Sequence, residues 1–187
     1  MHPSEILVSE PLRLMSLADY ERLAELGAFE DEQVELLEGV IVEMSPQGNR
    51  HAAVIMELNE VLVPALLGRA RVRVQLPLTV GKRSRPEPDV AVVPPGRYLD
   101  AHPAQAYLVI EVAETSLRKD RLLKPRIYAA AGVPECWVID VNDNTVLRMT
   151  GPVGELYTHV ETLGRADRVS LAVFPDVVVS LAEILPE

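Results

Sequence analysis

The 187-residue sequence contains one cysteine, Cys136, and only three lysines beside 15 arginines. A single cysteine excludes a disulfide framework and a cysteine-rich zinc site. No apolar run approaches the roughly 18 residues that a membrane-spanning helix needs. The first residues also lack the basic start and apolar centre of a signal peptide. These absences predict a cytoplasmic protein that does not associate with a membrane.

Acidic residues outnumber basic ones, and the net charge is −10. That balance by itself argues against a nucleic-acid partner. The charge is unevenly distributed, however, because residues 69–126 carry a net charge of +6, whereas residues 1–68 carry −10 and residues 127–187 carry −6. A basic central segment attracts a phosphate-bearing ligand locally. A solvated loop and helix surface is the alternative explanation.

The hydrophobic pattern predicts an α/β fold with a central mixed β-sheet flanked by helices. Helices are expected at residues 16–27, 49–67, within 119–131 and at 180–185. Strands are expected on both sides of Glu38-Gly39 and at 70–80, 89–93, 106–112, 135–141 and 145–149. We predict a single domain over residues 1–187, with a core at about 35–150. The N-terminal helix and the C-terminal strands in residues 151–187 are additions to that core.

The expected helix at 49–67 has Asn49 as its predicted N-cap residue. His51 lies on the apolar stripe of this helix and is expected to face inward. In the later helix, Pro125 follows Lys124 directly. Because proline removes a helical hydrogen bond and clashes with the preceding turn, the sequence predicts a helix that begins near Leu122 or a kinked one.

Two acidic residues stand at unusual places in the strand pattern. Asp89 begins an apolar strand in "RPEPDVAVV", and Glu111 lies inside another in "YLVIEV". A buried carboxylate is costly unless it is paired or bound to a cation. If the two strands are antiparallel neighbours, the carboxylates meet, and a divalent cation between them offsets their repulsion. Oxygen ligands alone favour Mg²⁺ or Mn²⁺ over zinc, and a structural ion pair is the alternative.

These residues also carry a resemblance to known enzymes. Pro88-Asp89 and the run Glu111-Val112-Ala113 resemble the PD-(D/E)xK nuclease superfamily, with alanine in place of its lysine. More narrowly, the chain is similar to a bacterial family of putative restriction endonucleases. The segments that carry this similarity are "ELLEGVIVEMSP" (35–46), "EVAETS" (111–116) and "GVPECWVID" (132–140). The resemblance spans residues 16–150 and implies a restriction-endonuclease-like core with an added N-terminal helix and β-hairpin.

The resemblance implies a metal-dependent endonuclease that hydrolyses phosphodiester bonds in DNA. Asp89 and Glu111, helped by the backbone carbonyl of Val112, are the implied ligands of Mg²⁺ or Mn²⁺. Lys124, displaced from the strand to the following helix, is the implied residue that orients the attacking water. Glu35 is a further ligand or base, with Glu38 and Glu43 as rivals because they lie in the same hairpin.

Other residues are expected to support this catalytic set. The supporting residues are His51, Asp120 and Tyr128. The alternative for His51 is a core histidine with satisfied hydrogen bonds, and the alternative for Asp120 is a helix cap or a salt bridge to Lys124. The candidate contacts to DNA phosphate are Arg83, Arg85, Arg118 and Arg121. The implied partner is double-stranded DNA, cut by a homodimer.

A second function remains open from the sequence. Ala113 in the place of lysine and the acidic net charge favour a catalytically inactive nuclease fold that binds DNA or another protein. An enzyme of another class that uses the same acids is disfavoured, because the sequence has no nucleophile elbow, phosphate loop or zinc-ligand spacing.

Overall fold

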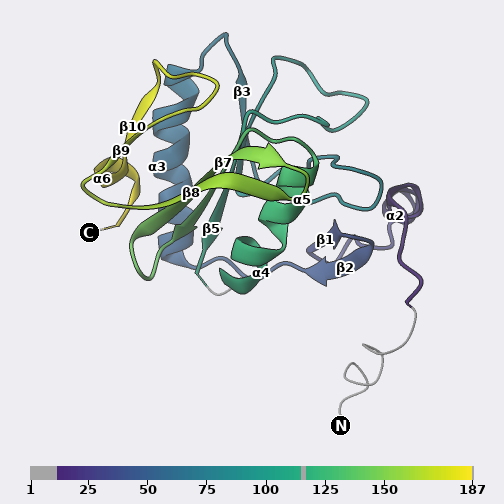
Figure 1. Cartoon of the computed structure of the whole chain (residues 1–187). Coiled ribbons are helices and arrows are strands. Elements are labelled where there is room, and N and C mark those ends of the chain that lie inside the picture. Colours follow the sequence, from purple (N-terminus) through teal and green to yellow (C-terminus); the bar gives the residue numbers. More distant parts are fainter. Residues whose placement is uncertain (1–11, 115–116, 187) are drawn as a thin grey trace.

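The computed structural model describes residues 12–114 and 117–186, and it describes only the backbone of residues 117 and 118. A central sheet contains the strands Arg71–Val74 (β3), Val90–Val93 (β4), Leu108–Ala113 (β5), Glu135–Asp140 (β6), Thr145–Val153 (β7) and Leu156–Gly164 (β8). The strands are ordered β3-β4-β5-β6-β7-β8 across the sheet (Figure 1). The pair β5–β6 is parallel and the other neighbouring pairs are antiparallel, so the sheet is mixed.

Helices cover both faces of this sheet. Helix α3 (Asn49–Ala65) packs on one face, where alternate residues of β4 and β5 such as Val92 and Ile110 meet Leu58. Helices α4 (Leu117–Leu122) and α5 (Lys124–Ala130) lie on the other face, where Val109 packs in one apolar cluster with Ile127. Because successive strand residues point to opposite faces, both sets are buried. The predicted α/β fold with a helix-flanked mixed sheet is confirmed.

An N-terminal helix and a β-hairpin are added to this body, as predicted. Helix α2 (Leu17–Glu25) begins after Ser16, whose Oγ accepts a hydrogen bond from the backbone N–H of Asp19 at 3.1 Å. The hairpin consists of β1 (Val34–Leu37) and β2 (Val40–Glu43). Its turn residues Glu38 and Gly39 have φ values of +50° and +84°, the combination that a two-residue type I′ turn requires.

The loop before β4 runs along β1. The backbone N–H of Arg85 donates to the carbonyl of Leu36 at 2.7 Å, and that of Gly39 donates to the carbonyl of Arg83 at 2.8 Å. These bonds hold the hairpin beside the chain that leads into β4. Glu35, next to Leu36 in β1, is therefore carried to the beginning of β4 although the two are distant in sequence.

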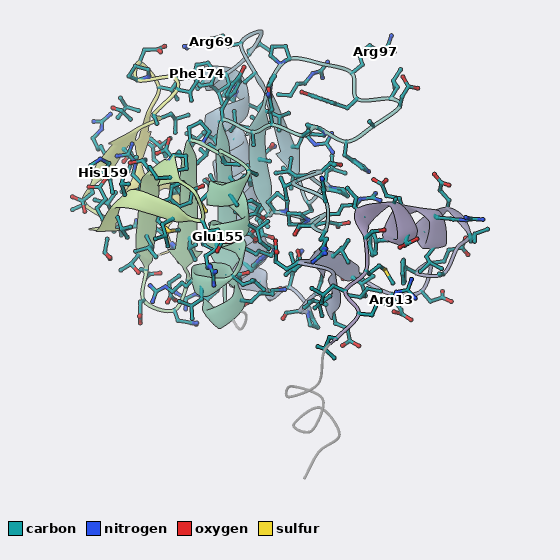
Figure 2. All side chains as sticks on the ribbon, turned by 45° about the vertical axis from the view of Figure 1, so that its right-hand side comes forward. Arg13, Arg69, Arg97, Glu155, His159 and Phe174 are labelled. Carbon is teal, nitrogen blue, oxygen red and sulfur yellow. The ribbon has the colours of Figure 1, made fainter. Side chains whose placement is uncertain are left out.

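The chain ends in the short strands Arg168–Ser170 (β9) and Val178–Ser180 (β10) and the predicted closing helix, Leu181–Ile184 (α6). Arg69, just after α3, pairs with Asp176 at 2.6 Å, and its guanidinium lies 4.8 Å from the centre of the Phe174 ring (Figure 2). The central sheet itself continues past residue 150 through β7 and β8. The division into one domain with a core at 35–150 stays a prediction.

Two local predictions differ from the structure, and a third agrees with it. The strand expected at 70–80 ends at Val74, because Gln75 adopts a φ of +50° and leaves the sheet. The N-cap of α3 is Gly48, without a side-chain hydrogen bond, so the prediction of Asn49 was wrong: the helix already includes that residue. The predicted break near Leu122 is confirmed, since Leu123 separates α4 from α5 and Pro125 lies in the first turn of α5, where its missing N–H is tolerated.

No helix among the described residues is long and apolar enough to cross a membrane.

Candidate active site

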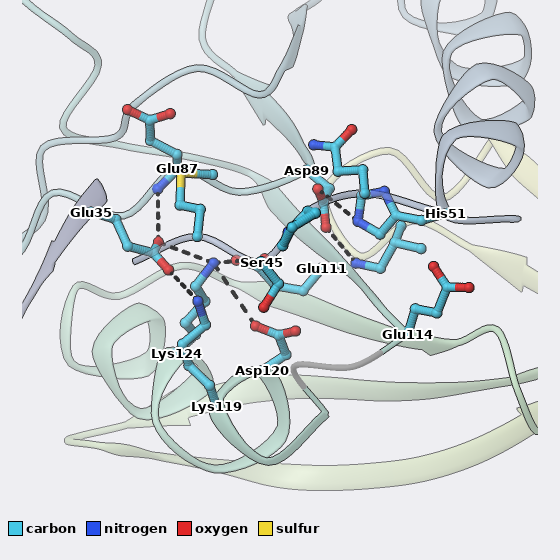
Figure 3. A pocket seen from close by; sticks show the side chains of 14 residues that line it. Glu35, Ser45, His51, Glu87, Asp89, Glu111, Glu114, Lys119, Asp120 and Lys124 are labelled. Carbon is cyan, nitrogen blue, oxygen red and sulfur yellow. Dashed lines mark hydrogen bonds and ion pairs between the residues drawn. The ribbon is translucent and has the colours of Figure 1, made fainter. Parts of the chain in front are cut away.

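Asp89 and Glu111 are brought together by the pairing of β4 with β5. Val90 pairs with Ile110 in antiparallel register, which places Asp89, one residue earlier, opposite Glu111. The backbone N–H of Val112 donates to Oδ2 of Asp89 at 2.7 Å. Both carboxylates line one small polar pocket with a cavity volume of about 40 Å³ (Figure 3). The two strands are thus the antiparallel neighbours that a shared cation requires.

Lys124 is the central cation of this pocket. Its Nζ lies 3.0 Å from Oε2 of Glu111, 3.1 Å from Oε2 of Glu35 and 3.9 Å from Oδ1 of Asp120 (Figure 3). Burial by itself lowers the pKa of Lys124, but the three carboxylates outweigh burial and raise that pKa above its ordinary value. The ammonium is therefore charged at any physiological pH, and Lys124 cannot serve as a proton acceptor.

Glu111 is buried on the face of the sheet that α5 covers. The hydroxyl of Tyr128 donates to its Oε1 at 2.5 Å, while Lys124 holds Oε2. Burial is the largest cause that raises the pKa of Glu111 well above its ordinary value; Lys124 lowers this pKa, and the charges of Asp120 and Asp89 raise it further. A carboxylate in this position is stabilised by any additional positive charge that comes close to it.

Of the three acids in the hairpin, the fold selects Glu35 for the pocket. Its side chain is fully buried, and the backbone N–H of Glu87 donates to its Oε2 at 3.3 Å. Glu38 instead accepts a hydrogen bond from the hydroxyl of Ser84, and Glu43 is exposed. The carboxylate of Glu87 points away from Glu35 (Figure 3), and burial raises its pKa.

Lys119 is a pocket residue that the sequence analysis did not single out. Its Nζ donates to Oε1 of Glu35 at 2.7 Å, and it lines the pocket together with Lys124. The signal that points to it is the scarcity of lysine, because two of the three lysines in the chain stand five residues apart after β5.

His51 faces inward from the first turn of α3, as expected, and contacts the second oxygen of Asp89. Its Nε2 lies 3.2 Å from Oδ1 of Asp89, while its Nδ1 is buried without a hydrogen-bond partner among the described residues. Burial lowers the pKa of His51, but the hydrogen bond and charge of Asp89 outweigh burial and raise it. Glu114 lies on the same side of the pocket (Figure 3).

Three of the four arginines proposed for DNA phosphate do not line this pocket. Arg83 is exposed, whereas Nη2 of Arg85 lies 2.7 Å from Nε2 of His102. Nη2 of Arg121 lies 3.9 Å from Oδ2 of Asp140. The side chain of Arg118 falls outside the described part of the structure. Contact of these arginines with phosphate stays a prediction.

The donor atoms of the pocket fit a hard divalent cation. Six lining residues are acidic and two are lysines: Glu35, Glu87, Asp89, Glu111, Glu114, Asp120, Lys119 and Lys124. Within the described residues, no group of three or more His, Cys, Asp or Glu side chains is arranged to hold a metal ion. The predicted set has two carboxylates and the carbonyl of Val112, and Mg²⁺ commonly has only one or two carboxylate ligands, the rest being water or substrate.

Binding an ion here requires an exchange of partners. Each carboxylate oxygen of Asp89 and Glu111 already contacts an internal donor: the N–H of Val112, His51, Lys124 or Tyr128. A divalent cation would displace some of these donors, or bind beside them, on the oxygens of the same two carboxylates. The arrangement can thus hold negative oxygen atoms close to one another and close to a permanently charged amine, as hydrolysis of a phosphodiester requires.

Known proteins resemble this chain in fold and in sequence. The crystal structure of a putative nuclease belonging to DUF820 from Anabaena variabilis ATCC 29413 matches with a TM-score of 0.71 and 18% sequence identity, covering 91% of this chain and 97% of that one. At this identity the match concerns the fold. No curated protein matches the chain. The model of the family Uma2, described as "Putative restriction endonuclease", matches residues 17–182. The predicted family is confirmed, and the chain belongs to the Uma2 family of putative restriction endonucleases.

Proposed function

We propose that this protein is a divalent-metal-dependent endonuclease that hydrolyses phosphodiester bonds in double-stranded DNA. The observation that carries the proposal is the convergence of Asp89, Glu111 and Lys124 on one polar pocket. Membership of the restriction-endonuclease family supports a nuclease activity. The metal requirement and the DNA substrate are the parts that experiments have to establish.

Asp89 and Glu111 are the proposed ligands of Mg²⁺ or Mn²⁺, together with the carbonyl of Val112. A divalent cation supplies polarisation of the phosphoryl group and a more acidic water molecule. Lys124 keeps Glu111 and Glu35 in place and is the proposed residue that orients the attacking water. Glu35 contacts both pocket lysines and is the candidate for a further ligand or for the base that takes the proton.

Three supporting residues orient this set. His51 contacts one oxygen of Asp89, Tyr128 donates to one oxygen of Glu111, and Asp120 lies near the ammonium of Lys124. Each of these contacts restricts a rotatable carboxylate or amine to one position. Such restriction matters because a phosphodiester is attacked only when the acids and the amine already have the productive geometry.

Metal binding is the first test of the proposal. Calorimetric titration of the native protein with Mn²⁺ is expected to show binding that Asp89→Ala abolishes. Glu43→Ala, which removes an exposed acid from the neighbouring hairpin, is the matched control and is expected to bind Mn²⁺ like the native protein. Equal Mn²⁺ binding by the native protein and by Asp89→Ala would show that the metal does not bind at this pocket.

Hydrolysis is the second test. Supercoiled plasmid incubated with Mg²⁺ is expected to be nicked by the native protein and by Glu43→Ala, but not by Lys124→Ala or Asp89→Ala. A cut of both strands needs two such pockets, so we expect a homodimer, which sedimentation of the purified protein measures. Nicking that persists in Asp89→Ala would point to a contaminating nuclease or to another site.

A catalytically inactive module that binds DNA or protein is the second candidate function. Two observations favour it: Ala113 stands where the superfamily has lysine, and Lys124 is surrounded by carboxylates with only 4% of its side chain exposed. Binding of duplex DNA without nicking, in the presence of either Mg²⁺ or Mn²⁺, would support this candidate over the first.

A further inference from the structure

The two lysines of the pocket differ in burial and in pairing. The side chain of Lys124 is 4% exposed and lies among three carboxylates. The side chain of Lys119 is 20% exposed and pairs with a single carboxylate, that of Glu35, at 2.7 Å. Lys82, the remaining lysine of the chain, is exposed and does not line the pocket. The three lysines therefore occupy three distinct environments.

Lys124 is not free to leave its position. Its movement toward a ligand would withdraw the positive charge from Glu111, which is 1% exposed. Removing one partner of a buried ion pair leaves an uncompensated charge, which is strongly unfavourable. The ammonium of Lys124 thus acts on the carboxylates around it and stays out of reach of a large substrate.

Lys119 can move without stranding its partner. If its ammonium leaves Glu35, that carboxylate still contacts Nζ of Lys124 at 3.1 Å and the backbone N–H of Glu87 at 3.3 Å. The flexible four-carbon stem of lysine lets the ammonium reach a new acceptor nearby. Exchange of one acceptor oxygen for another is therefore the only change required at Lys119.

The shape and charge of the pocket place the substrate beside Lys119. A cavity of about 40 Å³ has room for an ion or a few water molecules, each of which needs about 10–15 Å³ of such volume, but not for a nucleotide. DNA must therefore remain at the mouth, where the exposed residues Ser45 and Gln47 also lie. With six acids against two lysines in the lining, a phosphate at the mouth needs a cationic partner there.

From these contacts we infer that Lys119 is the residue of this pocket that contacts the phosphate of the DNA backbone, whereas Lys124 is a positioning residue that holds Glu111 and Glu35. This inference rests on the proposed function and assigns the substrate contact to a residue outside the superfamily motif. Lys119 donates to a non-bridging phosphate oxygen in place of Glu35, and Glu35 is then released on that side toward the reacting group.

The test compares the three lysines by the salt dependence of duplex binding, measured with a short labelled DNA duplex in Ca²⁺. Each phosphate contact contributes about 0.9 to the slope of log affinity against log salt concentration. Lys119→Ala is expected to weaken binding and to lower this slope by about one contact. Lys119→Arg is expected to restore the slope, and Lys82→Ala, the matched control, to leave it unchanged. Lys124→Ala, in contrast, is expected to lower the thermal unfolding temperature.

The outcomes separate this inference from the proposed function, because duplex binding is measured without hydrolysis. A reduced slope for Lys119→Ala in a protein that nicks no plasmid would support the phosphate contact and count against the nuclease activity. A native salt slope for Lys119→Ala, or a slope that stays reduced in Lys119→Arg, would overturn the inference even if the native protein is an active nuclease. Absence of duplex binding by the native protein would also overturn it.

Discussion

Two charged regions of opposite character both take side chains from the loop at residues 81–89. The pocket has six acidic lining residues and two lysines. In the other region, Nη2 of Arg73 lies 3.4 Å from Nδ1 of His102, and Nη2 of Arg85 lies 2.7 Å from its Nε2. Neither arginine forms an ion pair with a carboxylate of the described residues. One region thus concentrates negative charge and the other positive charge, only a few residues apart in sequence.

The histidines of the two regions respond in opposite directions. Burial lowers the pKa of His51, but Asp89 reverses this effect and the pKa is raised. Burial also lowers the pKa of His102, and the charges of Arg85 and Arg73 lower it further. Burial by itself therefore does not decide the direction of a histidine pKa shift in this fold, because Asp89 reverses its effect at His51 whereas two arginines add to it at His102. The acidic pocket attracts cations and protons, whereas the basic cluster excludes both.

The largest expected effect comes from removing the buried cation of the acidic region. Lys124→Met leaves Glu111 and Glu35 without their shared ammonium, and breaking such a buried pair costs about 3–5 kcal/mol of the free energy of unfolding. Denaturant unfolding measures this loss. A loss under roughly 1 kcal/mol, the level of an exposed ion pair, would mean that the pocket does not depend on Lys124 for its charge balance.

A control for that prediction lies on the other face of the sheet. Leu58→Ala creates a cavity under α3 and is expected to cost about 2–5 kcal/mol, because Leu58 is fully buried in the apolar core. It leaves the pocket charges in place, so Mn²⁺ binding at a temperature where the protein is folded is expected to stay native. Lys124→Met is expected to change both stability and Mn²⁺ binding.

A smaller effect compares one tyrosine from each region. Tyr128→Phe removes the hydroxyl that donates to the buried carboxylate of Glu111, and hydrogen bonds to charged groups contribute about 1.5–3 kcal/mol. Tyr98, whose ring faces Arg73, donates to the carbonyl of Pro94, and bonds between neutral groups contribute about 0.5–1.5 kcal/mol. In urea unfolding, Tyr128→Phe is therefore expected to lower the free energy of unfolding more than Tyr98→Phe does. The reverse order would show that Glu111 is held mainly by Lys124.

The basic region predicts a pH dependence of stability. Because the pKa of His102 is lower in the folded protein than its ordinary value, the unfolded chain takes up a proton that the folded chain refuses. The free energy of unfolding therefore falls as the pH drops through about 6.5, the ordinary histidine pKa. In His102→Gln this part of the fall is expected to disappear. Unfolding curves of the native protein and of His102→Gln, recorded from about pH 8 to about pH 5 to bracket this pKa, measure the difference.

The smallest expected effect is a change of one pKa. Arg85→Gln removes the nearer of the two guanidinium groups and is expected to raise the pKa of His102, which stays below its ordinary value because burial remains. Titration of the histidine ring signals by NMR measures this pKa directly. Arg83→Gln removes an exposed neighbouring charge and is the control. A pKa unchanged by Arg85→Gln would leave burial and Arg73 as the causes of the shift.

Much of the fold was predictable because it depends on local patterns. Continuous apolar runs predicted β4 and β5, and the proline after Lys124 predicted the break between α4 and α5. Strand lengths were less predictable: Gln75 leaves the sheet through a left-handed conformation that its residue type does not require. The cap of α3 was also missed, because glycine offers no side-chain signal at that position.

The sequence by itself predicted Asp89 at the start of one apolar strand and Glu111 inside another, and the family resemblance implied that Lys124 joins them. Only the tertiary structure decided which acid of the hairpin joins them, because the pairing of Leu36 with Arg85 carries Glu35 into the pocket and leaves Glu43 in solvent. The tertiary structure also decided how exposed each lysine is. Electrostatic energy depends on distance and burial, and both are set by chain segments that the sequence separates.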